Sequence, residues 1–178
     1  MAFDPVSDPD AYRRSLLTAL GDQDPAVVLA AGPEAARSLV ASAGWLLRVG
    51  PEPGEWSVLE CIAHLADSEL VTAARLRWIA AEDEPDIVGY DQAMWVSAMH
   101  QVEEDLDTLL GAFGANRRWN LELWERLPVA DRARSGIHRE RGRESIDLLV
   151  RLQAGHDIVH LAQAQRALET VRREATAT

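Results

Sequence analysis

Lysine is absent from the 178 residues, and all 18 basic side chains are arginine. The 29 acidic residues outnumber them, which gives a formal net charge of −11 at pH 7. A protein that binds nucleic acid or an anionic membrane surface needs a basic face that offsets phosphate charge. We therefore expect no nucleic acid and no membrane among the partners of this chain.

Cysteine and long apolar runs are also scarce. Cys61 is the single cysteine, which excludes a disulfide within the chain, and its helical setting favours a small core residue over a reactive thiol. No apolar run approaches the roughly 18 residues of a membrane span. The first five residues, Met1-Ala2-Phe3-Asp4-Pro5, lack the basic and then apolar pattern of a signal peptide. We expect a cytoplasmic protein.

The length and the 47% hydrophobic content predict one domain over residues 1–178. A chain of this size buries a core without disulfides or a structural metal. Any metal it binds would therefore serve function rather than hold the fold together.

No run of alternating β-branched residues is long enough to predict a sheet. Amphipathic segments predict a first helix over 8–21 and short helical pieces opened by Pro25 and Pro33. Long helices are predicted over 57–83, 93–127 and 145–173. These three and the N-terminal helix predict an all-α four-helix bundle with short extra N-terminal helical pieces.

Local signals mark the ends of these helices. Ser57 and Glu60 have the Ser-x-x-Glu form of a capping box, and Ser145 is the predicted N-cap of the last helix. The stretch 128–143, rich in Pro, Gly and charge, is the longest connection, and we expect it to cross over the bundle.

The most specific chemical signal is the pair His156 and His160. Residues four apart stand above one another on a helix, so both imidazoles can reach one ion. Projection of the last helix places the pair on a largely apolar stripe. Its members are Ser145, Leu149, Leu152, His156, His160, Gln163 and Ala167. Both histidines are therefore predicted to point at the core.

A second apolar stripe lies on nearly the opposite side of this helix. It consists of Val150, Ala154, Ile158, Leu161 and Leu168. An exposed stripe of this kind would be unusual for a monomer, so either the N-terminal segment or a second chain must cover it. We favour a homodimer.

His64 lies on a polar stripe of the 57–83 helix, together with Ser57, Glu60, Asp67, Ser68 and Arg75. Glu60 and Asp67 are spaced to accept the second ring N–H of His64 or to offer a carboxylate to an ion. The alternative is a solvated helix face on which His64 is an ordinary surface residue.

Other histidine patterns are weaker. His100 and His138 have no partner at ligand spacing, and a surface position is expected for both. The sequence His156-Asp157-Ile158-Val159-His160 matches the zincin pattern with Asp in place of Glu, but the shorter side chain would place the general base badly for a bound water. We therefore reject a zincin.

Three segments together resemble the DinB-like (DinB/YfiT) superfamily over about residues 45–170. They are Trp56-Ser57-x-x-Glu60-x-x-x-His64, Gly89-Tyr90-Asp91-Gln92-x-x-Trp95, and His156-Asp157-x-x-His160. The resemblance implies a four-helix bundle, commonly dimeric, that binds a divalent metal through one histidine of the second helix and a His-x-x-x-His pair of the last. By position, the implied ligands are His64, His156 and His160.

Three neutral imidazoles suit a divalent transition metal and leave a coordination position open. Zinc or nickel is expected first, with iron, cobalt or manganese as alternatives. The resemblance also implies thiol chemistry, because bacillithiol transferases and mycothiol-dependent isomerases of this fold hold a small thiol as its thiolate. The leading expectation is a metal-dependent thiol S-transferase in stress or detoxification chemistry, acting on a small-molecule thiol and an electrophilic substrate. Arg75, Tyr90 and Trp95 would hold the thiol.

Three alternatives stay open at this point. One is a metal-dependent hydrolase in which Glu60 or Asp67 acts as the catalytic base. Another is a non-catalytic dimer that binds a metal or a small ligand in a stress response. The last is a helical domain without metal.

Overall fold

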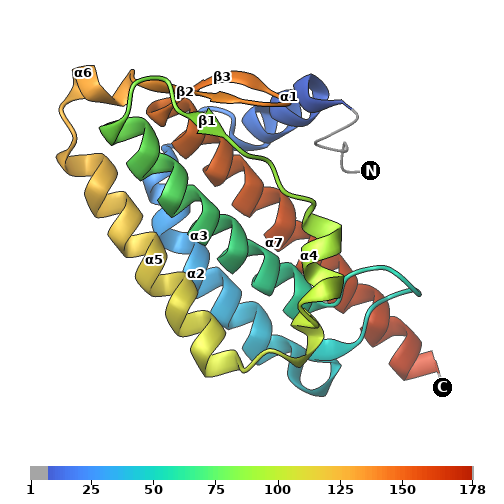
Figure 1. Ribbon diagram of the computed structural model, residues 1–178. Helices are drawn as coiled ribbons and strands as arrows, with labels where there is room; N and C mark the ends of the chain where they lie inside the picture. Colours follow the sequence, from blue (N-terminus) through green and yellow to red (C-terminus); the bar gives the residue numbers. More distant parts are fainter. Residues whose placement is uncertain (1–7, 178) are drawn as a thin grey trace.

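The computed structural model describes residues 8–177, so the N-terminal stretch considered above for a signal peptide lies outside the described residues. Four long helices form the bundle (Figure 1): α2 (Pro25–Ala43), α3 (Val58–Ala81), α5 (Leu106–Arg126) and α7 (Ile146–Ala177). α2 and α3 each pack against both α5 and α7. The predicted four-helix bundle is confirmed, and the chain is mostly helical. Across residues 8–177, no helix is long and apolar enough to cross a membrane.

The prediction chose the wrong first helix for the bundle. α1 (Pro9–Leu20) packs on the outside of α7, and α2 takes the place in the bundle that was expected for 8–21. Pro33 lies inside α2 without ending it. A proline removes the hydrogen bond to the carbonyl four residues earlier, which here is that of Leu29. Arg117 donates from Nη1 to this oxygen at 2.9 Å, so the carbonyl remains paired.

α3 begins and ends close to the prediction. Ser57 accepts from the main-chain N–H of Glu60, and the Glu60 carboxylate accepts from the main-chain N–H of Ser57, so the capping box is confirmed. A 3₁₀ turn, η1 (Gly44–Arg48), precedes it. Ser145 also caps as predicted, because its hydroxyl accepts from the N–H of Leu148 in α7.

The single helix predicted over 93–127 is wrong. The chain forms α4 (Gln92–Ala98), a 3₁₀ turn η2 (Gln101–Glu103) and then α5. His100 adopts a left-handed conformation with φ of 52°, which ends the first piece. Asp105 then starts α5 by accepting from the N–H of Thr108 at 3.0 Å.

The expected absence of a sheet is also wrong. After the short α6 (Val129–Arg132), the strands β2 (Ser135–His138) and β3 (Gly142–Ser145) form an antiparallel hairpin. β1 (Asp86–Ile87) pairs with β2 in parallel. The hairpin lies over the same end of the bundle as α1, where Arg13 donates to the main-chain oxygen of Arg141 (Figure 1). The connection predicted over 128–143 therefore contains most of a small sheet.

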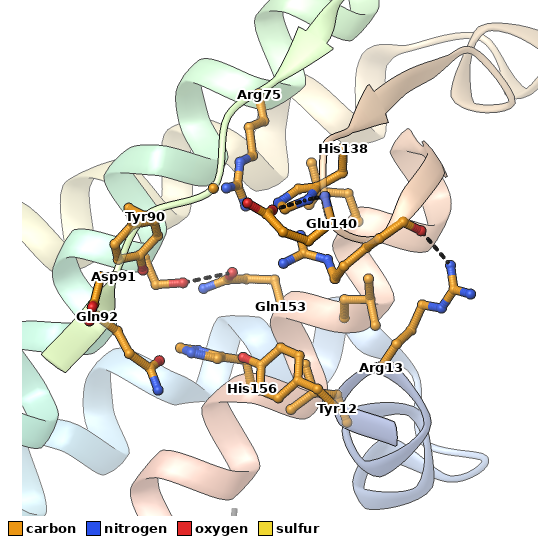
Figure 2. Close-up of a pocket in the computed structure, with 16 residues that line it drawn as sticks. Tyr12, Arg13, Arg75, Tyr90, Asp91, Gln92, His138, Glu140, Gln153 and His156 are labelled. Atoms are coloured by element: carbon orange, nitrogen blue, oxygen red, sulfur yellow. Dashed lines mark hydrogen bonds and ion pairs between the residues drawn. The ribbon is translucent and has the colours of Figure 1, made fainter. Parts of the chain in front are cut away.

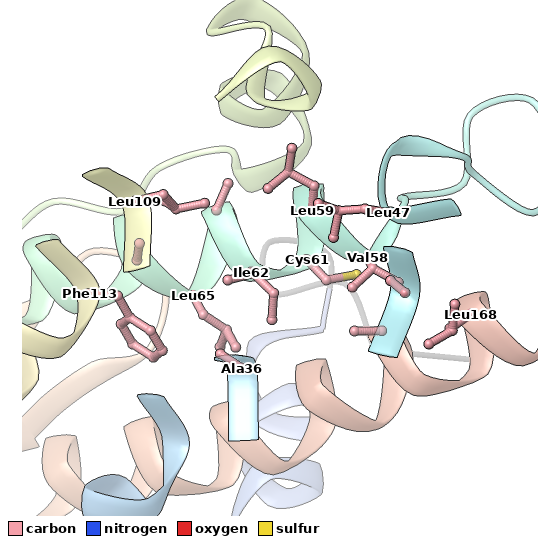
Figure 3. Close-up of a cluster of buried hydrophobic side chains, with 14 of the residues drawn as sticks. Ala36, Leu47, Val58, Leu59, Cys61, Ile62, Leu65, Leu109, Phe113 and Leu168 are labelled. Atoms are coloured by element: carbon pink, nitrogen blue, oxygen red, sulfur yellow. The ribbon is translucent and has the colours of Figure 1, made fainter. Parts of the chain in front are cut away.

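The hydrophobic core has two parts. One cluster lies where α3 meets the ends of α2, α5 and α7, and Figure 3 shows Ile62, Leu65 and Phe113 within it. The other lies toward the sheet and includes Leu76, Ile79 and Ile146. Buried polar side chains are also found in the bundle interior: His64, Ser68, Glu69, Thr72, Arg117, Asn120, Gln153, His156, Asp157 and His160. We call this set the polar layer.

The second apolar stripe of α7 is covered within the chain. Val150 and Ala154 are buried in the cluster near the sheet, and Ile158 packs against it. Leu161 and Leu168 belong to the other cluster. α7 contacts α1, α2 and α3, so it needs apolar residues on several faces. The stripe therefore gives no reason to expect a dimer, and the homodimer stays a prediction that rests on the family resemblance.

Candidate metal centre

The three predicted ligands come together inside the bundle. His64 lies on α3, His156 and His160 lie on α7, and their side chains are buried to 1%, 5% and 4% exposure. Each offers a ring nitrogen, and these three atoms lie within 4.8 Å of one another. The Nε2 atoms of His64 and His156 are 3.0 Å apart. Two nitrogens bound to one tetrahedral zinc at 2.0–2.1 Å would be about 3.3 Å apart, so the spacing suits a shared ion.

The polar stripe of α3 faces inward rather than toward solvent. Ser68 and Thr72 are buried beside His64, and both hydroxyls donate to Oε1 of Gln153 on α7, at 3.2 and 2.9 Å. These bonds fix the register of the two helices that carry the histidines. The solvated-face alternative for His64 is therefore wrong.

Burial keeps the three imidazoles neutral. It is the largest cause that lowers the pKa of His64 and His156 well below the usual value, and neighbouring histidines add to the effect. Burial also lowers the pKa of His160 to about 4, although its hydrogen bond with Gln163 opposes the shift. Neutral imidazoles are the form that binds a metal ion. The donor set and the protonation state thus fit a divalent transition ion.

Gln163 orients His160. Its Oε1 lies 2.9 Å from Nδ1 of His160, and a neutral imidazole that donates from Nδ1 keeps Nε2 free as a ligand. The Nδ1 atoms of His64 and His156 are buried and have no hydrogen-bond partner among the described residues. Trp56 covers the centre on one side, with its ring 5.1 Å from that of His64 and 5.9 Å from that of His160.

The two predicted catalytic carboxylates lie elsewhere. Glu60 is held by Ser57 in the capping box. Asp67 accepts from Gln101, and burial raises the pKa of Asp67. Neither residue lines the cavity described next, and neither pairs with Nδ1 of His64. Their placement therefore gives no support to a role as catalytic base.

A cavity of about 190 Å³ opens beside His156 (Figure 2). Its walls come from α1, α3, the segment before α4, the β2–β3 hairpin and α7. The lining residues are Tyr12, Arg13, Leu16, Ser68, Arg75, Gly89, Tyr90, Asp91, Gln92, His138, Glu140, Arg141, Leu149, Leu152, Gln153 and His156. We call it the hairpin cavity. Arg75 and Tyr90, both predicted to bind a small molecule, lie on its wall, whereas Trp95 stands behind Tyr90 with the two rings 4.4 Å apart.

Sequence reasoning misplaced or missed several of these residues. His138 was expected at the surface, as was His100, but only His100 is exposed. His138 is buried at the end of β2, and burial lowers its pKa to about 4. Tyr12 and Arg141 were not singled out, and their segments carry no spacing signal. Gln153 could have been found, because it is a polar residue one helical turn before His156.

A second cavity of about 530 Å³ reaches the centre from the side of His160. Trp56, Gln163 and Arg166 are among its lining residues. Tyr12, Leu16 and Gln92 line both cavities, and His156 lies on the wall of the first whereas His160 lies on the wall of the second. We call it the outer cavity.

α1 can approach the centre closely because residue 155 is glycine. A Cβ atom at Gly155 would lie 2.1 Å from the main-chain oxygen of Leu16, far inside contact distance. The close packing brings Tyr12 to the two cavities. Burial is the main cause that raises the pKa of Tyr12 to about 12, so its phenol stays protonated at neutral pH.

Fold and site together define a four-helix bundle with a buried three-histidine centre. The sequence profile of the DinB superfamily matches residues 4–164. The chain belongs to this superfamily. Its structure is similar to that of YfiT from Bacillus subtilis, with a TM-score of 0.72 and 20% identity, over 93% of this chain and 89% of that one. YfiT is described as a candidate metal-dependent hydrolase with an unusual four-helix-bundle topology; at this identity the likeness shows the fold.

Two proteins of Oceanobacillus iheyensis are similar in sequence. One is 32% identical over 110 residues, which are 61% of this chain and 63% of that protein. The other is 29% identical over 118 residues, which are 65% of this chain and 66% of that protein. Both proteins are named as candidate metal-dependent hydrolases. The matched stretches span less than two thirds of either relative's length.

Proposed function

We propose that this protein is a metal-dependent hydrolase of a small ester or amide. The observation that carries the proposal is the convergence of three neutral, buried imidazoles, of which His156 lines the hairpin cavity and His160 lines the outer cavity. A catalytic metal site needs three protein ligands and an open position next to space for substrate. The names of the two sequence relatives support the same reaction class.

The residues around the centre have different roles in the proposed reaction. His64, His156 and His160 would hold the ion, and Gln163 keeps His160 in the required tautomer. A divalent ion at this place supplies a Lewis acid, which lowers the pKa of a water molecule or a thiol. The hairpin cavity holds the substrate beside His156. In hydrolysis, water adds its oxygen to the acyl carbon, the bond to the leaving group breaks, and that group takes up a proton.

Tyr90 would supply that proton. It lines the hairpin cavity, and its ring centroid is 6.5 Å from that of His64. Burial raises the pKa of Tyr90, while a hydrogen bond with Ser68 opposes the rise. The phenol is therefore protonated at neutral pH and can donate to an oxygen on which negative charge develops.

The second candidate is the thiol S-transferase of stress or detoxification chemistry. The outer cavity favours it, because a transfer needs room for two reactants and the centre has one histidine on the wall of each cavity. A thiolate sulfur would form a bond to the electrophilic carbon as the leaving group departs with the electron pair. The superfamily resemblance supports this reading, and the names of the sequence relatives support hydrolysis.

One set of assays separates the two reactions. The protein is purified without a histidine tag, stripped with a chelator and reloaded with zinc or nickel. Hydrolysis predicts metal-dependent cleavage of p-nitrophenyl esters, and transfer predicts metal-dependent conjugation of cysteine to monochlorobimane. His64→Ala should remove either activity, whereas His100→Ala, an exposed histidine outside the site, should keep it. Turnover that is equal with and without metal would refute both.

A further inference from the structure

Arg75 is a buried cation that forms no ion pair with any described residue. It is 7% exposed, and its Nη2 donates to the main-chain oxygen of Val88 at 2.8 Å. Its Nε is buried and has no hydrogen-bond partner among the described residues. Within residues 8–177, no carboxylate lies at ion-pair distance from it. A buried charge is unfavourable unless an opposite charge and hydrogen bonds compensate for the lost hydration.

The other two arginines at the hairpin cavity form ion pairs. Arg141 holds Glu144 through two hydrogen bonds, and Arg13 pairs with Asp10. Glu140 lies 2.9 Å from Nδ1 of His138, but burial keeps His138 neutral, so the Glu140 carboxylate adds a negative charge to the same wall and opposes the lowering of the Arg75 pKa by burial. Asp91 accepts from the N–H of Met94 as the N-cap of α4. Within residues 8–177, Arg75 is therefore the arginine of this cavity that forms no ion pair.

Gln153 adds a second free donor to the same cavity. Its Oε1 accepts from the hydroxyls of Ser68 and Thr72, which settles the orientation of the amide. Its Nε2 is buried and has no partner among residues 8–177. In Figure 2, Gln153 lies between Arg75 and His156. The cavity thus presents a cation and an amide donor on the way to the three histidines.

We infer that the hairpin cavity binds the carboxylate of a small substrate, with Arg75 as its counter-ion and Gln153 as a second donor. Arg75 forms no ion pair, and charge-assisted hydrogen bonds to a carboxylate would satisfy both free donors, Nε of Arg75 and Nε2 of Gln153. An engineered protein cavity of about 150 Å³ holds benzene, so about 190 Å³ suits a substrate of that size. Carboxylate binding needs no metal, whereas its role in holding substrate rests on the proposed function.

The test is calorimetric titration of the metal-free protein with benzoate. Benzamide, which has the same shape and no charge, is the ligand control, and inorganic phosphate is the alternative oxyanion. We expect benzoate to bind at least about tenfold more tightly than benzamide, the factor that one charge-assisted hydrogen bond provides. Equal affinities would overturn the inference, and tighter binding of phosphate than of benzoate would contradict the choice of carboxylate.

Three variants locate the site. Arg75→Met should weaken benzoate binding at least about tenfold. Gln153→Glu keeps an oxygen that accepts from Ser68 and Thr72 but places a negative charge in the cavity. This variant should therefore abolish benzoate binding. Arg77→Met is the matched control, because Arg77 lies on the same helix but outside the cavity, with its guanidinium over Trp119. Circular dichroism checks that each variant folds.

The outcomes separate this inference from the proposed function. Benzoate binding that depends on Arg75, in a protein with no metal-dependent turnover, would keep the carboxylate site and remove the hydrolase. The opposite outcome is metal-dependent turnover together with a benzoate affinity that is the same in wild type, Arg75→Met and Gln153→Glu. It would keep the hydrolase and remove the carboxylate site.

Discussion

Arg117 donates a hydrogen bond to the main-chain oxygen of Leu29, the carbonyl that Pro33 leaves without a helical partner. The same guanidinium forms ion pairs with Glu69 on α3 and Asp157 on α7. A single buried side chain of α5 therefore contacts all three other helices of the bundle. Asp157 directly follows the candidate ligand His156, so Arg117 contacts α7 at the residue next to that ligand.

Arg117→Met should destabilise the fold by about 3–5 kcal/mol, because Glu69 and Asp157 would stay buried without their cation. Urea unfolding followed by circular dichroism measures the change in the free energy of unfolding. Arg118→Met is the matched control, since Arg118 is the exposed neighbour on the same helix, and we expect a change within about 0.5 kcal/mol. Equal effects of the two substitutions would contradict a special role for Arg117.

Alanine in place of His64, His156 or His160 should each remove stoichiometric metal binding and leave the helix content unchanged. The reason is that the two hydrophobic clusters hold the bundle without the ion. Elemental analysis of protein purified without a tag gives the metal content, and circular dichroism gives the helix content. His100→Ala should bind metal like wild type. One metal per chain in any of the three site variants would refute the assignment.

Gln163→Leu should weaken metal affinity by roughly 10 to 100 fold, because His160 would lose the partner that fixes its tautomer. Competition with a chromogenic chelator measures the affinity. Glu60→Ala provides the contrast. It removes one half of the capping box, so it should lower stability by about 0.5–2 kcal/mol while metal affinity stays the same. A larger loss of affinity in Glu60→Ala than in Gln163→Leu would reverse these roles.

Gly155→Ala should destabilise the protein by about 1–3 kcal/mol, although alanine is the better helix former by about 1 kcal/mol. The steric effect wins because the new Cβ would meet the main-chain oxygen of Leu16, which cannot turn away as a side chain could. Gly111→Ala is the control, since nothing lies within 4 Å of its added Cβ and a small stabilisation is expected. Thermal unfolding of both variants decides the sign.

Cys61 should not react with thiol reagents in the folded protein. It is buried, and burial is the largest cause that raises its pKa to about 12, so almost no thiolate exists at pH 8. Addition of urea should expose one titratable thiol per chain. Rapid labelling of the native protein would show that the helix opens easily around this residue.

Patterns that repeat along a helix were sufficient to predict much of the site. His156 and His160 were placed on an inward stripe of the last helix, and this position is confirmed by their burial. The burial of His64 was harder to predict, because its stripe contains Ser68 and Arg75, and a polar stripe is typical of a solvent-exposed helix face. Here polar residues are buried because they face other polar residues on α7, and a single helix cannot reveal its partner.

Long-range pairing explains the elements that were missed. The strands β2 and β3 contain Gly136 and Glu144 rather than an alternating β-branched pattern, and their pairing with each other and with β1 defines them. α2 was divided at Pro33 because the rescue of the Leu29 carbonyl comes from Arg117, 88 residues away. His138 was judged a surface residue for the same reason, since the hairpin that buries it had not been predicted.

The polar layer sets a limit on how stable this bundle can be. Replacement of buried ionic groups by well-packed apolar residues is often neutral or stabilising by about 1–4 kcal/mol. A redesigned chain with leucine and phenylalanine at Glu69, Arg117 and Asp157 would avoid the cost of burying three charges, yet α3, α5 and α7 would lose the ion pairs that join them and the Leu29 carbonyl would lose its donor. Laboratory selection for heat resistance alone would be expected to erase this layer first, whereas selection for turnover would retain it.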